Sequence, residues 1–138
     1  MIFADSSFWI AFKNKGDPDH KSAMKVMEEI RAGRHGRLCT SDYVLDEVAT
    51  FISQRLKWHD IAVETLTSIL ASKEVDLLKV DSVIVQGAVS VFKKHDFLSF
   101  TDATTCVLMD THKISTITTF DEDFAKLGFR VIKGEKPQ

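Results

Sequence analysis

The sequence predicts an α/β fold, a three-layer sandwich around a mostly parallel central sheet of about five strands. Two observations lead to this class. Short runs of apolar or β-branched residues alternate with longer segments that repeat apolar residues at helical spacing. The chain also has 138 residues, of which 44% are hydrophobic, which is enough for one core without disulfides. We therefore expect a single domain over residues 1–138.

The first half of the chain predicts two strands, each followed by helices. Ile2–Ala4 is a short apolar run, and Ser6 is expected to cap a helix that ends at the Asn14–Pro18 turn. The second strand, Leu38–Thr40, precedes Ser41, which is another expected N-cap. Apolar residues at helical spacing predict three further helices: His20–Ala32, Asp42–Lys57 and Ile61–Ala71.

The second half continues the alternation of strands and helices. The predicted strands are Val75–Val80, Ile114–Thr119 and Arg130–Ile132. The predicted helices are Ser82–Lys93 and Thr101–Asp110, and a turn or helical turn is expected over Phe120–Leu127. Thr101 or Asp102 is expected to open the second of these helices. The first helix should end at the far edge of the sheet, so we expect His95–Thr101 to return as mostly extended chain.

The composition excludes several classes of protein. Eighteen Lys and Arg residues against twenty Asp and Glu give a formal charge of −2, so any contact with nucleic acid must be local. Cys39 and Cys106 have no partners at metal-ligand spacing, which argues against a disulfide scaffold and a zinc ribbon. No apolar run approaches the roughly 18 residues that span a bilayer, and the N-terminus lacks a basic leader. We therefore expect no membrane contact and a soluble cytoplasmic protein.

Acidic residues fall where a parallel α/β sheet collects its chemistry, beyond the carboxyl ends of the strands. Asp5 follows the first predicted strand, and Asp121 and Asp123 follow the fourth. Asp102 opens a helix. Glu47 lies about one and a half turns into the helix that leaves the second strand, and helical side chains tilt back toward the N-terminus. Glu47 is therefore within reach of the same edge.

Carboxylates that converge in this way repel one another. A pair at 4 Å costs about 1 kcal/mol in water and about 4 kcal/mol at an effective dielectric constant of 20. Protonation relieves the repulsion, and so do divalent cations, among which Mg²⁺ and Mn²⁺ suit hard oxygen ligands. Two such ions about 3.5–4 Å apart activate water and stabilise the leaving oxygen in phosphodiester hydrolysis.

Each acid taken alone also has a simpler explanation. Asp5 and Asp102 have the positions of helix caps, Asp121 that of a turn residue, and Glu47 that of a solvated acid on a helix. Their joint placement at strand ends, or in the helices that leave them, favours the metal site.

The same segments resemble the motifs of PIN-domain ribonucleases, a family that includes the VapC-type toxins of prokaryotic toxin–antitoxin pairs. IFADSSFWIA resembles the opening strand, whose aspartate is followed by a small hydroxyl residue. TSDYVLDEVAT resembles the second motif, LSFTDATTCVLM the third and TITTFDEDFAKLGF the fourth. The four segments occur in the family's order and are spread from near the start of the chain to near its end.

The resemblance implies a metal-dependent endoribonuclease that hydrolyses RNA phosphodiester bonds, the toxin of a type II toxin–antitoxin pair, with Mg²⁺ or Mn²⁺ as cofactor. The implied metal ligands and catalytic residues are Asp5, Glu47, Asp102 and Asp121. Asp123 is a lesser candidate ligand, and the hydroxyls of Ser6 and Thr119 would support the site. The implied partners are an RNA substrate, a cognate antitoxin and a second copy of the chain in a homodimer.

Bulky residues on the early helices offer a surface for such partners. The resemblance implies that the antitoxin packs against the chain near its acids. We expect most of the bulky residues to be core and some to expose an apolar groove: Phe8, Trp9, Phe12, Phe51 and Trp58.

Other functions are weighed against the nuclease. A phosphatase of the haloacid dehalogenase type needs Asp-x-Asp after its first strand, but here the sequence is Asp5-Ser6-Ser7. A receiver domain needs an acidic pair at that point, which is also missing. A non-catalytic interaction module on the same scaffold and a housekeeping RNA-processing nuclease stay open. The sequence does not specify the RNA target, since transfer, ribosomal and messenger RNA all fit.

Overall fold

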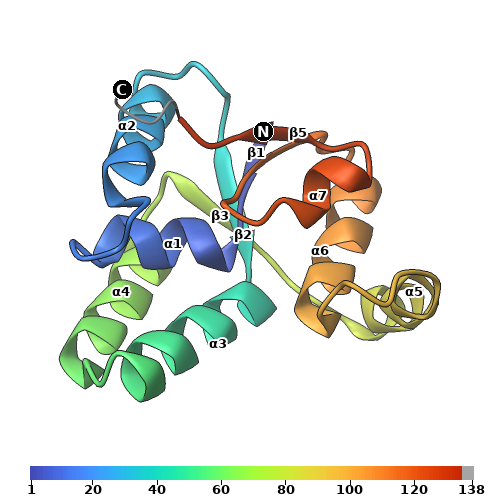
Figure 1. Ribbon diagram of the computed structural model, residues 1–138. Coiled ribbons are helices and arrows are strands. Elements are labelled where there is room, and N and C mark those ends of the chain that lie inside the picture. The colour runs from blue at the N-terminus through green and yellow to red at the C-terminus, as the bar shows by residue number, and fades with distance from the viewer. Residues whose placement is uncertain (135–138) are drawn as a thin grey trace.

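The computed structural model describes residues 1–134 as three layers around a five-stranded parallel sheet (Figure 1). The strands are β1 (Ile2–Ala4), β2 (Leu38–Ser41), β3 (Val75–Leu78), β4 (Thr116–Thr118) and β5 (Arg130–Ile132). They lie in the order β3-β2-β1-β4-β5, and every neighbouring pair is parallel. The predicted fold class and strand number are confirmed.

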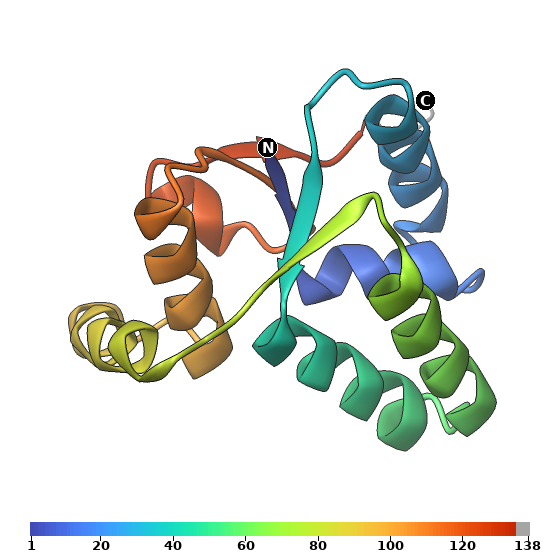
Figure 2. The same cartoon turned by 180° about the vertical axis from the view of Figure 1, so that it is seen from behind.

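Helices cover both faces of the sheet. Their bounds are α1 (Ser6–Lys13), α2 (His20–Arg31), α3 (Asp42–Thr50), α4 (His59–Ala71), α5 (Ser82–Lys94), α6 (Phe100–Thr111) and α7 (Asp123–Lys126). The views in Figures 1 and 2 place α1 to α4 on one side of the sheet and α5 to α7 on the other. None of the helices within residues 1–134 has the length and apolar character needed to cross a membrane.

The helix predicted over Asp42–Lys57 is shorter and less regular than expected. It is α-helical to Thr50 and continues as a π-helical turn, η1 (Phe51–Arg55). Lys57 then adopts a φ of 60°, a left-handed conformation that ends helices. Helical structure thus ends at Arg55, before the predicted end at Lys57, and α4 begins at His59.

Two predicted helix starts are corrected and one is confirmed. Ser41 caps α3, because its side chain accepts a hydrogen bond from the amide of Val44 at 3.1 Å. Ser6 does not cap α1: Asp5 is the N-cap residue, and the Ser6 hydroxyl donates to Glu47 instead. Helix α6 is capped by Ser99 rather than opened by Thr101 or Asp102.

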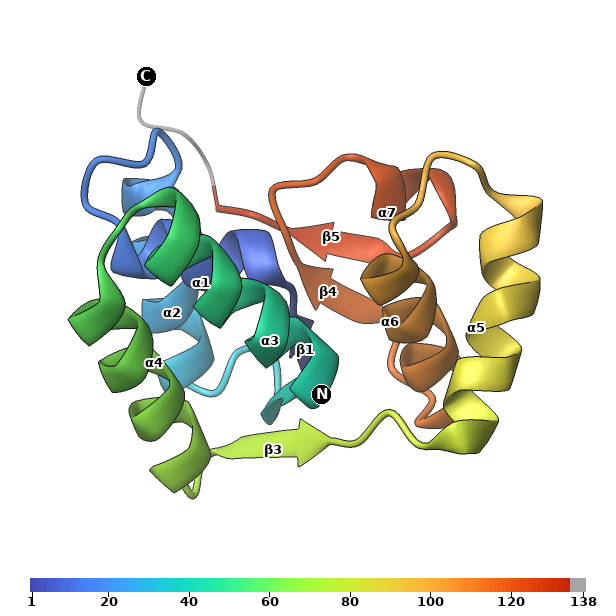
Figure 3. The same cartoon turned by 90° about the horizontal axis from the view of Figure 1, so that it is seen from below.

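The segment between α5 and α6 also differs from its prediction. Helix α5 is seen nearly end-on in Figure 1 and lengthwise in Figure 3, so it lies crosswise to the central strands. It therefore does not run back to the far edge, and no long extended return is needed. His95–Ser99 instead contains a turn, in which the amide of Leu98 donates to the carbonyl of His95 at 3.3 Å.

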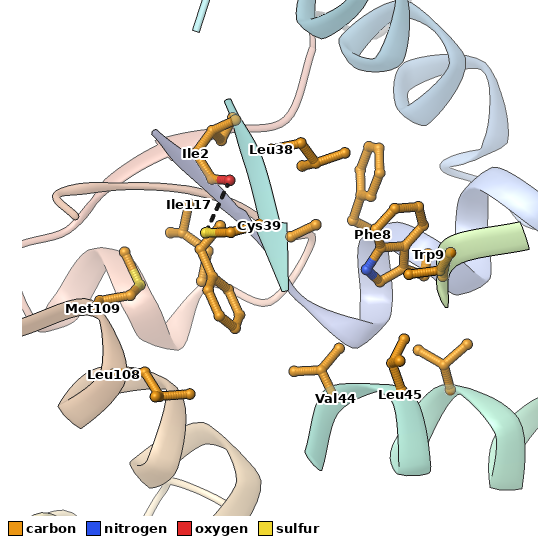
Figure 4. Packing of buried hydrophobic residues seen from close by; sticks show 14 of the residues in the cluster. Ile2, Phe8, Trp9, Leu38, Cys39, Val44, Leu45, Leu108, Met109 and Ile117 are labelled. Atoms are coloured by element: carbon orange, nitrogen blue, oxygen red, sulfur yellow. Dashed lines mark hydrogen bonds between the residues drawn. The ribbon is translucent and has the colours of Figure 1, made fainter. Parts of the chain in front are cut away.

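The core surrounds the interior strands of the sheet. Strands β1 and β4 have helices on both faces, and a strand covered on both faces is apolar along its length; Ile2, Phe3, Ala4 and Ile117 are fully buried. Figure 4 shows side chains of α3 and α6 pointing toward the strands from two directions. Trp9 satisfies its indole N–H by donating to Thr40 Oγ1 at 3.2 Å. The core thus holds in place the ends of β1 and β4.

Truncating the core at β4 should destabilise the fold. We expect Ile117→Ala to lower the free energy of unfolding by about 2–5 kcal/mol, because it deletes fully buried methyl and methylene groups and leaves a cavity. Urea denaturation measures the change. The control Val63→Ala removes a side chain that is 49% exposed and should change the free energy by less than about 0.5 kcal/mol. Equal losses in both variants would contradict the observed packing of β4.

Candidate active site

The carboxyl ends of β1 and β4 bring two segments together that are far apart in the sequence. Ala4 of β1 pairs with Thr118 of β4, and the amide of Asp5 donates to the carbonyl of Thr118 at 3.1 Å. Asp5 therefore lies beside Thr119, whose hydroxyl donates to Asp5 Oδ2 at 2.9 Å. The register of the sheet thus places the first acid against the loop that carries Asp121.

Asp5 is an acid in an unfavourable environment. It is 2% exposed, and its Oδ1 has no hydrogen-bond partner among residues 1–134. The pKa of Asp5 is raised to about 7, mainly by burial and secondly by the nearby negative charge of Asp102. The hydrogen bond from Thr119 opposes this rise. A buried carboxylate oxygen without a donor is costly, and a cation at this point would relieve the cost.

Asp102 approaches the same point from α6. Its Oδ2 accepts from the amide of Ser99 at 3.4 Å, and its amide donates to Ser99 Oγ at 3.1 Å, which forms a capping box. Burial raises the pKa of Asp102 to about 6, and the charges of Glu47 and Asp121 add to this rise, while the hydrogen bond to Ser99 opposes it. Asp102 is both a cap residue and a member of the acidic group.

Glu47 and Asp121 complete the group. Glu47 is half-buried on α3, where it accepts the hydroxyl of Ser6 and adds to the charge felt by Asp5 and Asp102. Asp121 Oδ1 accepts from the amide of Asp123 at 2.9 Å, so Asp121 is also the turn residue that the simpler explanation described. Figure 3 shows α3 and α6 beginning on either side of the end of β1. The structure therefore brings Asp5, Glu47, Asp102 and Asp121 close enough to influence one another.

Asp123, the lesser candidate metal ligand, forms an ion pair away from the other acids. Its Oδ1 accepts from Lys126 Nζ at 3.1 Å in an ion pair within α7.

The four acids are neighbours but do not form a closed coordination shell. Across the described part of the chain, no three His, Cys, Asp or Glu side chains enclose a ready-made metal position. Their oxygens are partly committed to Ser6, Ser99 and the amide of Asp123. The donor set nevertheless fits a hard divalent cation, because it is all carboxylate, mutually repelling, and includes the unpartnered Oδ1 of Asp5.

Sequence reasoning missed two serines that organise the site. Ser7 Oγ lies 3.1 Å from Thr119 Oγ1 and accepts from the amide of Phe120 at 2.9 Å, which ties α1 to the loop that carries Asp121. Ser99 caps the helix that carries Asp102. The Ser-x-x-Asp spacing of Ser99 and Asp102 is a recognisable capping-box signal, whereas nothing local distinguishes Ser7 from an ordinary helical serine.

The comparisons with known proteins agree on one family. The family model described as PIN domain matches residues 2–130. The 23S rRNA-specific endonuclease VapC20, from two strains of Mycobacterium tuberculosis, is 33% identical over 137 residues, which cover 98% of this chain and 100% of the relative.

Two solved structures share the architecture. The crystal structure of Mycobacterium tuberculosis VapC20, a sarcin–ricin loop cleaving toxin, has a TM-score of 0.84 and 32% identity and covers 94% of this chain and 96% of its own. VapBC2 from Rickettsia felis, bound to a DNA fragment from its promoter, has a TM-score of 0.70, covering 98% of this chain and 100% of that chain. Its identity is only 13%, so the second likeness concerns the fold alone.

Stability in the absence of divalent cations should fall as the pH rises through the range in which Asp5 ionises. The pKa of Asp5 is raised from 3.8 to about 7, so between these values the folded chain binds more protons than the unfolded chain. The free energy of unfolding therefore decreases with rising pH in this window, on the order of a few kcal/mol, and the contribution levels off above it. Urea denaturation in EDTA across this range measures the slope.

Asp5→Asn should reduce this slope, because the amide does not ionise; the slope that remains comes from Asp102, whose pKa is also raised, to about 6. Asp110→Asn, which changes an exposed acid on the same helix as Asp102, is the matched control and should leave the slope as it is. A stability that rises with pH in wild type, or an equal slope in Asp5→Asn, would show that Asp5 is not the buried acid described.

Proposed function

The chain belongs to the PIN-domain family, and from this premise we propose that it is a divalent-metal-dependent endoribonuclease that acts as the toxin of a toxin–antitoxin pair. The observation that carries the proposal is the unpartnered Oδ1 of buried Asp5 within a group of mutually repelling carboxylates. The likeness to VapC20 over nearly the full length of both chains supports it. We also propose that residues 1–138 work as one nuclease domain.

The proposed ligands of Mg²⁺ or Mn²⁺, which are also the proposed catalytic residues, are Asp5, Glu47, Asp102 and Asp121, with Asp123 in a lesser role. A divalent ion held there supplies Lewis-acid activation of water and neutralises charge on the phosphodiester. The chain itself positions the oxygens: Thr119 holds Oδ2 of Asp5, and Ser6 holds Glu47. Ser99 fixes the start of α6 and with it Asp102.

We propose ribosomal RNA of the large subunit as the substrate. VapC20 is named as a 23S rRNA-specific endonuclease, and its structure as a sarcin–ricin loop cleaving toxin. An identity of 33% without a long unmatched segment in either chain favours a shared substrate class over transfer or messenger RNA. A ribosomal substrate would place the activity in the cytoplasm.

The proposed antitoxin has a fitting surface on the opposite end of the sheet. An apolar groove of about 620 Å³ lies between α1, α2 and α4, lined by Trp9, Phe12, Met27, Ile30 and Ile69 among others. Leu38 and Val75, which also line it, begin β2 and β3, so the groove is at the amino end of these strands and not near the acids as expected. We propose that an apolar antitoxin segment binds there.

A homodimer is proposed as well. Helix α5 exposes Val83 and Val89, which offer an apolar surface separate from the groove. A monomer by light scattering at micromolar concentration would count against this arrangement.

Replacing the central acid should abolish cleavage. With Mg²⁺ or Mn²⁺, we expect wild-type protein to cut a ribosomal RNA fragment that contains the sarcin–ricin loop, and Asp5→Asn to be slower by on the order of 100-fold or more, since even outer-shell changes cost 10–100-fold. Gel-resolved cleavage rates test this, with EDTA expected to stop the reaction.

The exposed acid variant Asp110→Asn serves again as the control and should cleave as wild type does. Undiminished metal-dependent cleavage by Asp5→Asn would refute the assignment of the site. A wild-type protein that binds Mn²⁺ but cuts no RNA would instead favour a non-catalytic module.

A further inference from the structure

The connection between α5 and α6 combines aromatic and basic side chains within a short stretch. From the end of α5 to the start of α6 these are Phe92, Lys93, Lys94, His95, Phe97 and Phe100. Proteins that hold single-stranded nucleic acid pair cations for the phosphates with aromatic rings on which bases stack. In a chain with a formal charge of −2, such a local combination offers a place to hold RNA outside the acids, although Asp96 adds one negative charge to it.

Phe97 is the exposed centre of this cluster. Its side chain is 40% exposed, although the adjacent Leu98 is buried and anchors the turn in the core. The ring of His95 lies 5.5 Å from the ring of Phe97 at 65°, in an edge arrangement. Lys126 Nζ of α7 lies 5.2 Å from the centroid of the Phe97 ring. Neighbours from two elements therefore hold the ring in place and still leave part of it open to solvent.

Lys126 adds a charge that is available to a ligand. Its side chain is 62% exposed while it contacts both the Phe97 ring and Asp123. An exposed ammonium beside an aromatic ring can contact a phosphate while a base stacks on the ring.

The cluster adjoins the acidic site through both of its loops. Phe97 lies just before the capping box of Ser99 and Asp102, and Lys126 lies in the helix that follows Asp121. In Figure 3 the α5–α6 connection runs alongside α7, in agreement with the contact between Phe97 and Lys126. A strand of RNA leaving the acids along this side would meet the Phe97 ring.

Resting on the nuclease function proposed above, we propose that Phe97 and Lys126 form an RNA-binding subsite, in which an unpaired base stacks on Phe97 and Lys126 contacts a neighbouring phosphate. His95 acts as a positioning residue that holds the ring. The subsite binds substrate and leaves the hydrolytic step to the acids.

The first test separates stacking from packing. We compare Phe97→Leu, which stays apolar but loses the π-face, with Phe97→Tyr, which keeps it, on a hairpin RNA of the sarcin–ricin loop sequence. We expect Phe97→Leu to raise KM by roughly 5- to 100-fold with kcat within about twofold, and Phe97→Tyr to stay near wild type. Trp58→Leu changes another aromatic residue, 45% exposed and outside the cluster, and should leave KM unchanged.

A spectroscopic signal makes the stacking visible. Hairpins that carry 2-aminopurine at unpaired positions should lose fluorescence on binding to wild type and to Phe97→Tyr, and keep it with Phe97→Leu. Binding is measured without divalent ions, so this readout does not depend on cleavage.

The second test addresses Lys126. Because each phosphate contact on a single strand contributes about 0.7 to the slope of log K against log salt, Lys126→Gln should lower that slope by about 0.7. Lys25→Gln, an exposed lysine on α2, is the control and should not change it.

The outcomes separate the two proposals. Cleavage by wild type with an unchanged KM in Phe97→Leu overturns the subsite and leaves the nuclease. Binding that depends on Phe97 without any cleavage supports the subsite and overturns the nuclease. RNA that is neither bound nor cut overturns both, and a raised KM with rescue by Phe97→Tyr supports both.

Discussion

The burial of a carboxylate among other carboxylates is the constraint around which the carboxyl edge of this protein is organised. Asp5 lies at the end of the most central strand, is almost fully buried, and is close to Asp102 and Glu47. A core alone cannot make this arrangement favourable, because burial and like charge both oppose ionisation. Proton uptake, hydrogen bonds to the carboxylate and a bound cation each offset the free-energy cost of burying this charge.

Hydroxyl groups from three parts of the fold supply part of this compensation. Thr119 follows β4, Ser6 and Ser7 belong to the first turn of α1, and Ser99 caps α6. Together they hold one oxygen of Asp5 and orient its neighbours, while the other oxygen of Asp5 keeps no partner within the described chain. The network therefore positions the acids and leaves one oxygen of Asp5 free to accept a cation or a proton.

Two other surface features lie at opposite ends of the sheet. The apolar groove lies at the amino ends of β2 and β3, whereas the aromatic and basic cluster around Phe97 adjoins the loops of Asp102 and Asp121. A partner in the groove and RNA on the cluster would thus contact different ends of the sheet. Helix α1 contacts both regions, since Trp9 lines the groove and Ser6 donates to Glu47.

The sequence by itself predicted the fold class, the approximate strand positions and the placement of several acids at one edge of the sheet, because hydrophobic period and strand-end placement are local signals. The tertiary structure decided the features that depend on contacts between distant parts of the chain. The crosswise direction of α5 replaced the extended return with a turn, since a helix's direction depends on what it packs against. Ser6 turned from a cap into a donor for Glu47, and Ser7 joined Thr119, because their partners lie far away in the sequence and meet only in the folded chain.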